Sequence, residues 1–95
     1  MILGVPVQDG HELTNALLRS LAKTITGFNT KVVLIDNASD QRYVGRLYDD
    51  LPVTVIHNEK NRGYYYPLKQ LRDAYPEEGI IGIIHNDMVL YEKGW

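Results

Sequence analysis

The sequence predicts an α/β domain built on a mainly parallel sheet. Short runs rich in Val and Ile are nearly continuous in apolar character, as strands buried on both faces are, and they are Ile2–Val7, Lys31–Ile35, Val53–Ile56 and Ile80–Ile84. Stretches with helical spacing separate these runs. Strands that alternate with helices are joined by crossovers, which favours a three-layer α/β/α arrangement around a four-stranded sheet.

The first connection carries the clearest helical pattern, from about His11 to Thr26. One apolar stripe and its neighbours consist of Leu13, Leu17, Leu21 and Ile25, flanked by Leu18 and Ala22. Asp9 precedes this segment and Glu12 follows three residues later, as in a capping box. We therefore expect Asp9 to cap the helix, and Gly27 to end it.

The other two connections are also predicted to be helical. The pattern over Asp40–Asp50 is weaker and depends on Tyr43, Leu47 and Tyr48. The pattern over Tyr64–Tyr75 places Leu68, Leu71 and Tyr75 at helical spacing. Pro67 falls in the first turn of this last segment, where proline is tolerated, and Pro76 ends it.

Composition bounds the class of protein. The chain has 95 residues, 44% hydrophobic and 23% charged, with net charge -2 and no cysteine, so we expect one domain over residues 1–95. These values exclude disulfides and thiolate zinc sites, and there is no basic stripe for nucleic acid. No apolar run reaches the roughly 20 residues of a membrane helix, so a soluble cytoplasmic protein is expected. GxGxxG, GxxxxGK[ST] and GxSxG are all absent, which argues against a dinucleotide dehydrogenase, a P-loop NTPase and a serine hydrolase.

Candidate site residues follow the strands, because ligands of parallel sheets bind beyond the carboxyl ends of the strands. Asp36 can accept hydrogen bonds from a base or ribose, or it can open a turn with Asn37. Arg62 can face a phosphate, or it can be an exposed loop residue. His85 and Asp87 can hold Mg²⁺ or Mn²⁺, or they can form a strand-end turn. His11 and His57 are expected to have hydrogen-bonded structural roles.

Taken in order, these segments resemble family 2 glycosyltransferases, which have the GT-A fold. That family has a proline at the tip of its first strand, Asp-Asn-x-Ser after the second, an Asn-Arg-Gly-aromatic loop, and an acidic metal motif followed by Gly-Trp. The matching segments are Gly4–Val7, Asp36–Ser39, Asn61–Tyr64, His85–Asp87 and Gly94–Trp95. The resemblance covers the whole chain and implies the Rossmann-like, nucleotide-sugar-binding front half of such an enzyme, truncated relative to the full family.

The resemblance assigns roles to individual positions. The residues that it places against the nucleotide-diphosphate sugar donor are Pro6, Val7, Asp36, Asn37, Arg62 and Asn86. It makes Asp87 the metal ligand, with His85 at the other position of the metal motif. The implied reaction is inverting transfer of the sugar to a glycan or other hydroxyl acceptor, in which the divalent metal offsets charge on the leaving diphosphate.

The chain also departs from the family pattern. His85 replaces an acidic residue or Asn, Gln8 and Asp9 replace an aromatic-Asn pair, and Leu68 stands where the family often has Asn. No residue matches the catalytic base carboxylate, which in the family lies beyond Trp95. A small non-catalytic α/β binding or interaction module is therefore the alternative.

A prediction about assembly follows from the last strand. Ile80–Ile84 contains no charge and no proline, so as an edge strand it can pair with another chain. We expect a homo-oligomer that buries this edge, with Tyr91 and Trp95 as interface residues. Self-coverage of the edge by residues 89–95 is the alternative.

Overall fold

The computed structural model describes residues 1–24, 30–44, 46–48, 51–60 and 66–85. Its elements, in chain order, are β1 (Ile2–Val7), α1 (His11–Thr24), β2 (Lys31–Asn37), β3 (Arg46–Tyr48), β4 (Leu51–Asn58), α2 (Tyr66–Ala74) and β5 (Ile81–Ile83). The strands form one sheet in the order β3-β4-β2-β1-β5. β1, β2, β4 and β5 pair in parallel with one another, which confirms the predicted mainly parallel, Rossmann-like sheet.

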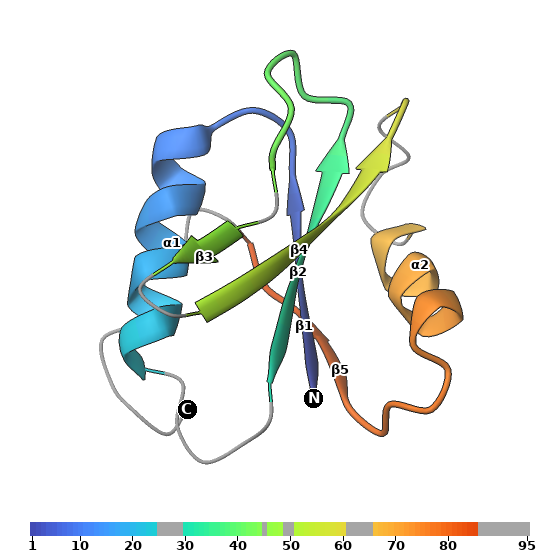
Figure 1. Cartoon of the computed structure of the whole chain (residues 1–95). Helices are drawn as coiled ribbons and strands as arrows, with labels where there is room; N and C mark the ends of the chain where they lie inside the picture. The colour runs from blue at the N-terminus through green and yellow to red at the C-terminus, as the bar shows by residue number, and fades with distance from the viewer. Residues whose placement is uncertain (25–29, 45, 49–50, 61–65, 86–95) are drawn as a thin grey trace.

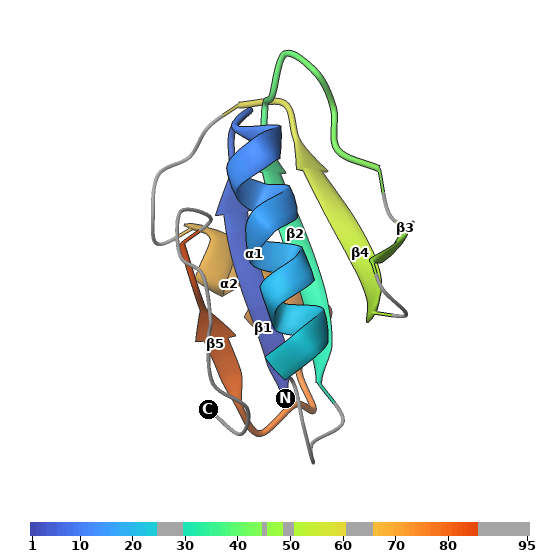
Figure 2. The same cartoon turned by 90° about the vertical axis from the view of Figure 1, so that its left-hand side faces the viewer.

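The two helices cover opposite faces of the sheet, so the predicted three-layer arrangement is confirmed (Figure 1). Leu17, Leu18 and Leu21 of α1 are fully buried against inward-facing residues of β1, β2 and β4. On the other face, Leu71 of α2 is fully buried against Ile2, Val33 and Ile35, which form the second apolar cluster. Figure 2 shows α1 lying along the sheet in front of β1 and β2.

The buried face of α1 is rotated from the predicted stripe. Its buried residues are Thr14, Leu17, Leu18, Ser20, Leu21 and Thr24, whereas Leu13 is 54% exposed. Leu68 of α2 is 40% exposed as well, although Leu71 of the same predicted pattern is buried. Small hydroxyl residues lie within the contact face of α1, where Ser20 and Thr24 donate hydrogen bonds to the carbonyls of Leu17 and Ser20. A pattern read from leucines alone misses these positions.

Gly4 lets α2 approach the middle of the sheet closely. A Cβ atom added at this position would lie 2.3 Å from Leu71 Cδ1 and 3.0 Å from Ile83 Cδ1, so no larger residue fits without rearrangement. Ile83 belongs to β5, which pairs with β1 through the register Gly4↔Ile83. Glycine therefore permits the contact between β1, β5 and α2.

The predicted helix over residues 40–50 is wrong for its described part. Residues 46–48 form β3, which pairs antiparallel with β4, and residues 41–44 are not helical. The physical reason lies in the preceding loop, where two aspartates accept the backbone N–H groups of residues 39, 40, 41 and 43. Those N–H groups are therefore engaged by side chains and do not begin a helix.

Strand lengths and helix ends differ in detail from the prediction. β2 and β4 extend through Asn37 and Asn58, because polar side chains at their ends pair across the sheet. β5 is shorter than predicted, although Ile84 N–H still donates to the Gly4 carbonyl. The Gly10 carbonyl accepts the N–H of Thr14 and begins α1, while the Asp9 carboxylate is directed to another loop, so the expected cap is wrong.

Candidate functional site

Polar side chains gather at the carboxyl ends of β2 and β4. The register aligns Val7, Asp36 and His57 across three neighbouring strands, and it aligns Asn37 with Asn58. Since Val7 packs in the cluster beneath α1, Asp36 and His57 lie on the α1 side of the sheet. Asn37 and Asn58 lie on the α2 side. Two polar layers therefore meet at one edge, which is the edge where parallel sheets bind ligands.

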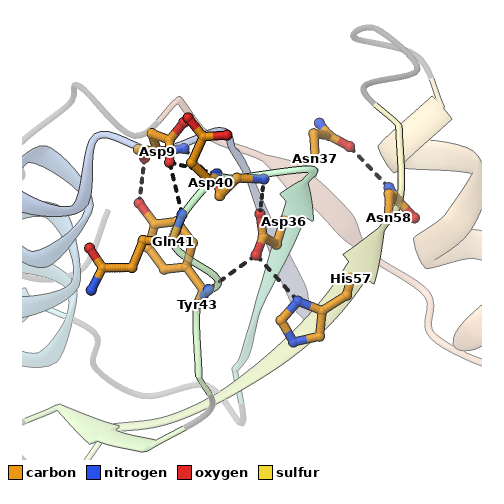
Figure 3. A network of polar contacts seen from close by, with 9 residues as sticks. Asp9, Asp36, Asn37, Asp40, Gln41, Tyr43, His57 and Asn58 are labelled. Atoms are coloured by element: carbon orange, nitrogen blue, oxygen red, sulfur yellow. Dashed lines mark hydrogen bonds and ion pairs between the residues drawn. The ribbon is translucent and has the colours of Figure 1, made fainter.

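Asp36 is the most deeply buried charged residue of this edge, with 1% of its surface exposed. Its Oδ1 accepts the N–H of Ser39 at 3.0 Å, and its Oδ2 accepts the N–H of Tyr43 at 3.1 Å. His57 Nδ1 lies 3.2 Å from the same Oδ2 (Figure 3). The carboxylate thus folds the loop that follows β2 and joins it to β4.

The pKa of Asp36 reflects two opposing influences. Burial raises the pKa of the carboxyl, because it disfavours the charged form. Hydrogen bonds from the Ser39 hydroxyl, from the Tyr43 and Ser39 backbone and from His57 lower it, and together they prevail. The pKa of Asp36 therefore lies below its usual value, so the folded state holds this group as a carboxylate at neutral pH.

Asp9 is a second aspartate that fixes the same loop. Its Oδ1 accepts the N–H of Asp40 at 2.9 Å and that of Gln41 at 3.4 Å, while its own N–H donates to Ser39 Oγ at 2.8 Å. Asp9 adopts a positive φ of 53°, which aspartate tolerates better than most residues. The loops that follow β1 and β2 are consequently tied together by reciprocal hydrogen bonds.

Tyr43 anchors the far end of the loop against α1. Its hydroxyl donates to the Asp9 carbonyl at 2.6 Å and lies 2.8 Å from Thr14 Oγ1. The ring is 3% exposed and stacks on His11, with ring centroids 4.0 Å apart. His11 is thus a packing residue, and its buried Nε2 has no hydrogen-bond partner within the described residues. His57 has the hydrogen-bonded structural role that was expected, through its contact with Asp36. The same expectation is wrong for the Nε2 atom of His11, which makes no hydrogen bond to a described residue.

On the α2 side, an amide cluster joins the strand ends to the helix. Asn58 Nδ2 donates to Asn37 Oδ1 at 2.9 Å and to Gln70 Oε1 at 2.8 Å. Gln70 Nε2 donates back to Asn58 Oδ1 at 2.7 Å. Because Gln70 belongs to α2, this cluster fixes the helix relative to β2 and β4. Asn37 is 5% exposed, so its amide serves the framework.

A cleft of about 510 Å³ opens beside the Asp36–His57 pair. Besides those two residues, it is lined by Ala38, Ser39, Arg42, Asn58 and Glu59. Arg42 and His57 also border a neighbouring hollow of about 590 Å³ that runs along β4. The cleft combines an imidazole, a guanidinium and a carboxylate, so it can bind a polar ligand with both donors and acceptors.

The predicted donor-binding residues lie in different environments. Asp36 lines the cleft, whereas Asn37 is buried on the α2 side of the sheet, Pro6 is partly exposed in β1, and Val7 is 2% exposed in the apolar core. Arg62, Asn86 and Asp87 lie outside the described residues. The donor-binding roles stay predictions for Pro6, Val7, Asp36, Asn37, Arg62 and Asn86.

The predicted metal site is represented by a single described residue. His85 is exposed after β5, and its partner in the prediction, Asp87, lies outside the described ranges. Within the described part of the chain, no group of three His, Cys, Asp or Glu residues could hold a metal ion. The role of His85 and Asp87 as metal ligands therefore stays a prediction.

Sequence reasoning missed Tyr43 and Gln70 as members of this edge. Each makes its contact with a residue at least 12 positions away, as in the bond from Tyr43 to the Asp9 carbonyl and the bond between Gln70 and Asn58. The sequence did contain one usable signal. Tyr43 is a large aromatic residue that stands among polar residues after β2, which indicates that its ring is buried.

Comparisons with known proteins add a fold relationship. No family model matches the chain, and no curated protein matches it. The crystal structure of Staphylococcus aureus TarS 1–349 superposes with a TM-score of 0.61 at 23% sequence identity. The match covers 90% of this chain and 27% of the TarS chain, so the chain spans about a quarter of that structure's length. The likeness shows that the two share a fold.

None of the helices in the described residues is long and apolar enough to cross a membrane.

Proposed function

We propose that the chain binds a nucleotide-diphosphate sugar as the donor-binding part of a glycosyltransferase with the GT-A fold. The fold match supports this, because TarS is a family 2 glycosyltransferase with that fold. The ordered segments from Gly4–Val7 to Gly94–Trp95 resemble the same family independently of the superposition.

One observation carries the proposal: the strand order of the parallel sheet brings the Asp36 segment and the His57 segment to a single polar cleft of about 510 Å³. Pockets of roughly 300–1,000 Å³ accommodate small ligands. The cleft lies at the carboxyl edge of the sheet, where nucleotides bind in parallel α/β folds. A nucleoside offers the ring donors and acceptors that such a lining requires.

The full reaction proposed for the family is inverting transfer to an acceptor hydroxyl. No residue of this chain is nominated as the base, so we expect the 95-residue chain to bind donor without transferring sugar. Incubating the purified chain with donor and acceptor, and following release of nucleoside diphosphate, tests this expectation. Robust turnover would require a base within the chain.

The binding test is calorimetry with UDP, GDP and dTDP, each with and without Mn²⁺. We expect one of the three to bind, and we expect Asp87→Ala to abolish the metal-dependent part of the binding with a change in stability within about 0.5 kcal/mol. His85→Ala addresses the second proposed ligand. If the folded protein binds none of the three nucleotides, the donor-site proposal is wrong and a non-catalytic interaction module is favoured.

Self-association is a separate proposal that concerns the edge of the sheet. β5 is the outer strand beside β1, and Ile80 and Ile83 are 62% and 37% exposed. An apolar edge strand can pair with the same strand of another copy. Light scattering over a concentration series should show a mass above the monomer, and Ile83→Lys should reduce it. A constant monomeric mass would remove this proposal.

A further inference from the structure

The outer edge of β4 is only partly covered by its neighbour. β4 spans Leu51–Asn58, and β3 pairs with its first three residues alone. On the inner side, β2 pairs with residues 53–58. Among the described residues, therefore, no strand pairs with the outer side of residues 54–57, which we call the open edge. Every second residue of a strand directs its N–H and C=O groups to one side, so the open edge presents backbone donors and acceptors to an incoming strand.

The sequence of the open edge contains none of the residues that usually prevent strand addition. It reads Thr-Val-Ile-His, without proline, lysine or an acidic residue, whereas Pro52 lies in the part that β3 covers. Natural edge strands often carry such residues, because they discourage pairing with other chains. At about 3.3 Å per residue, four residues offer about 13 Å of edge, which is enough for a short additional strand.

A hollow beside the open edge provides room for side chains. The loop that follows β2 leaves the sheet and stands apart from β4 before it returns at β3 (Figure 2). Residues of this loop and of β4 enclose a hollow of about 590 Å³, whose lining is Arg42, Tyr43, Val44, Val53, Thr54, Val55 and His57. Val44 is 71% exposed although it is apolar, and Val55 is only partly buried. A small apolar side chain placed here would therefore bury surface that the described chain leaves open.

Arg42 gives the hollow a positive end. It is exposed, and in the described part of the chain no ion pair joins its guanidinium to a carboxylate. Val55 and His57 lie on the α1 side of β4, because side chains alternate along a strand and Val55 packs against the cluster beneath α1. An added strand would thus place one side chain beside Val44 and Val55, and the side chain two positions away beside Arg42 and His57. An apolar residue fits the first place and a carboxylate fits the second.

We propose that the open edge binds an extended segment of a partner protein by β-strand addition, and that this segment carries an acidic residue two positions from a small apolar residue. Backbone hydrogen bonds to residues 54–57 supply affinity, and the hollow with Arg42 supplies selectivity. A helix satisfies its backbone groups internally, so it would leave the open edge unused. The inference does not depend on nucleotide binding, since it concerns the side of β4 and the hollow beside it.

The test uses the full chain and the peptide Glu-Thr-Val-Thr-Val-Thr-Glu, acetylated and amidated at its ends, with amide chemical shifts from two-dimensional NMR. The peptide reads the same in both directions, so it presents a carboxylate toward Arg42 in a parallel or an antiparallel pairing. We expect saturable shift changes at residues 42–44 and 53–57. Two isomers of the peptide carry N-methyl groups on one or the other alternate set of amides. One should bind like the parent, and the other, which lacks the N–H groups of the pairing side, should bind at least tenfold more weakly.

Charge exchange tests the contact with Arg42. Arg42→Glu should weaken binding of this peptide about fivefold, and it should strengthen binding of the peptide with Lys in place of Glu by a similar factor. The matched control is Arg72→Glu, the same substitution at an exposed position of α2, which should change neither affinity. Equal effects of the two substitutions would show that Arg42 is not the contact.

Other outcomes would overturn the inference as a whole. No shift change at about 1 mM peptide with folded protein, equal binding of the two N-methyl isomers, or shift changes at β5 instead of β4 would each show that it is wrong. Light scattering covers the remaining occupant: if the free chain is a dimer that the peptide converts into monomers, a second copy occupies the open edge and a separate partner is excluded. If the peptide binds but no nucleotide does, only the proposed function fails.

Discussion

Replacing Asp36 by asparagine tests whether its carboxylate organises the carboxyl edge of the sheet. The substitution keeps the side-chain volume but removes the charge, and it turns an NH₂ donor toward partners that are themselves donors. This carboxylate accepts hydrogen bonds from the N–H groups of Ser39 and Tyr43, and it also contacts His57 Nδ1. Hydrogen bonds to a buried charged group contribute about 1.5–3 kcal/mol each, and one donor is left unsatisfied, so we expect Asp36→Asn to lower the free energy of unfolding by about 3 kcal/mol.

The loss should depend on pH with a defined sign. The folded-state pKa of Asp36 lies below its unfolded value, which is about 3.9. The stabilisation is therefore fully present above the unfolded pKa, and it is lost as pH falls through the folded pKa. The difference between wild type and Asp36→Asn should be largest at neutral pH and should shrink below about pH 4.

Urea unfolding followed by circular dichroism, from pH 7 downward, measures both effects. The matched control is Asp40→Asn, the same substitution at an exposed position four residues along the chain, where we expect a change within about 0.5 kcal/mol. A loss for Asp36→Asn below about 1 kcal/mol at pH 7, or a loss that does not vary with pH, would refute the proposed role of the charged carboxylate.

Other substitutions test the packing around the site, each by urea unfolding. Gly4→Ala should destabilise by about 1–2 kcal/mol, because the new methyl group overlaps Leu71 in a full core. Gly82→Ala is its control, since its Cβ would meet its nearest atom at 3.5 Å, and should change stability by about 0.5 kcal/mol or less. Equal effects of the two would contradict the close approach of α2. Tyr43→Phe should cost about 1–2 kcal/mol, because the Asp9 carbonyl loses its 2.6 Å donor, and a neutral result would show that the hydroxyl is dispensable.

The parallel sheet could be predicted from the sequence because apolar runs identify strands that are buried on both faces. Ile2–Val7 was predicted with the observed bounds, and α1 was predicted to begin at His11, as it does. The ends of β2 and β4 were missed because polar residues, among them Asp36 and His57, continue the ladder beyond the apolar run. Local hydropathy identifies the core of a strand more readily than its functional end.

The loop after β2 could not be predicted, because distant side chains determine its conformation. A helical pattern over residues 40–50 is visible in the sequence, yet Asp9, about 31 positions before Asp40, holds the N–H groups that a helix would use. Propensity is a weak influence and gives way to such tertiary contacts. The candidate cleft could not be predicted for the same reason, since Arg42 and His57 come together only through this loop.

The two polar layers at the carboxyl edge have different roles, because one stabilises the framework and the other lines the cleft. The amides of Asn37, Asn58 and Gln70 satisfy one another on the α2 side, whereas the Asp36 layer on the α1 side ends in a half-exposed imidazole. On the α1 side, the cleft is therefore lined by an imidazole that the Asp36 carboxylate holds in place. Since the Asp36 carboxylate is fixed by two backbone N–H groups, the orientation of His57 is set before any ligand arrives. Such preorganisation reduces the ordering that binding of a ligand beside His57 would otherwise require.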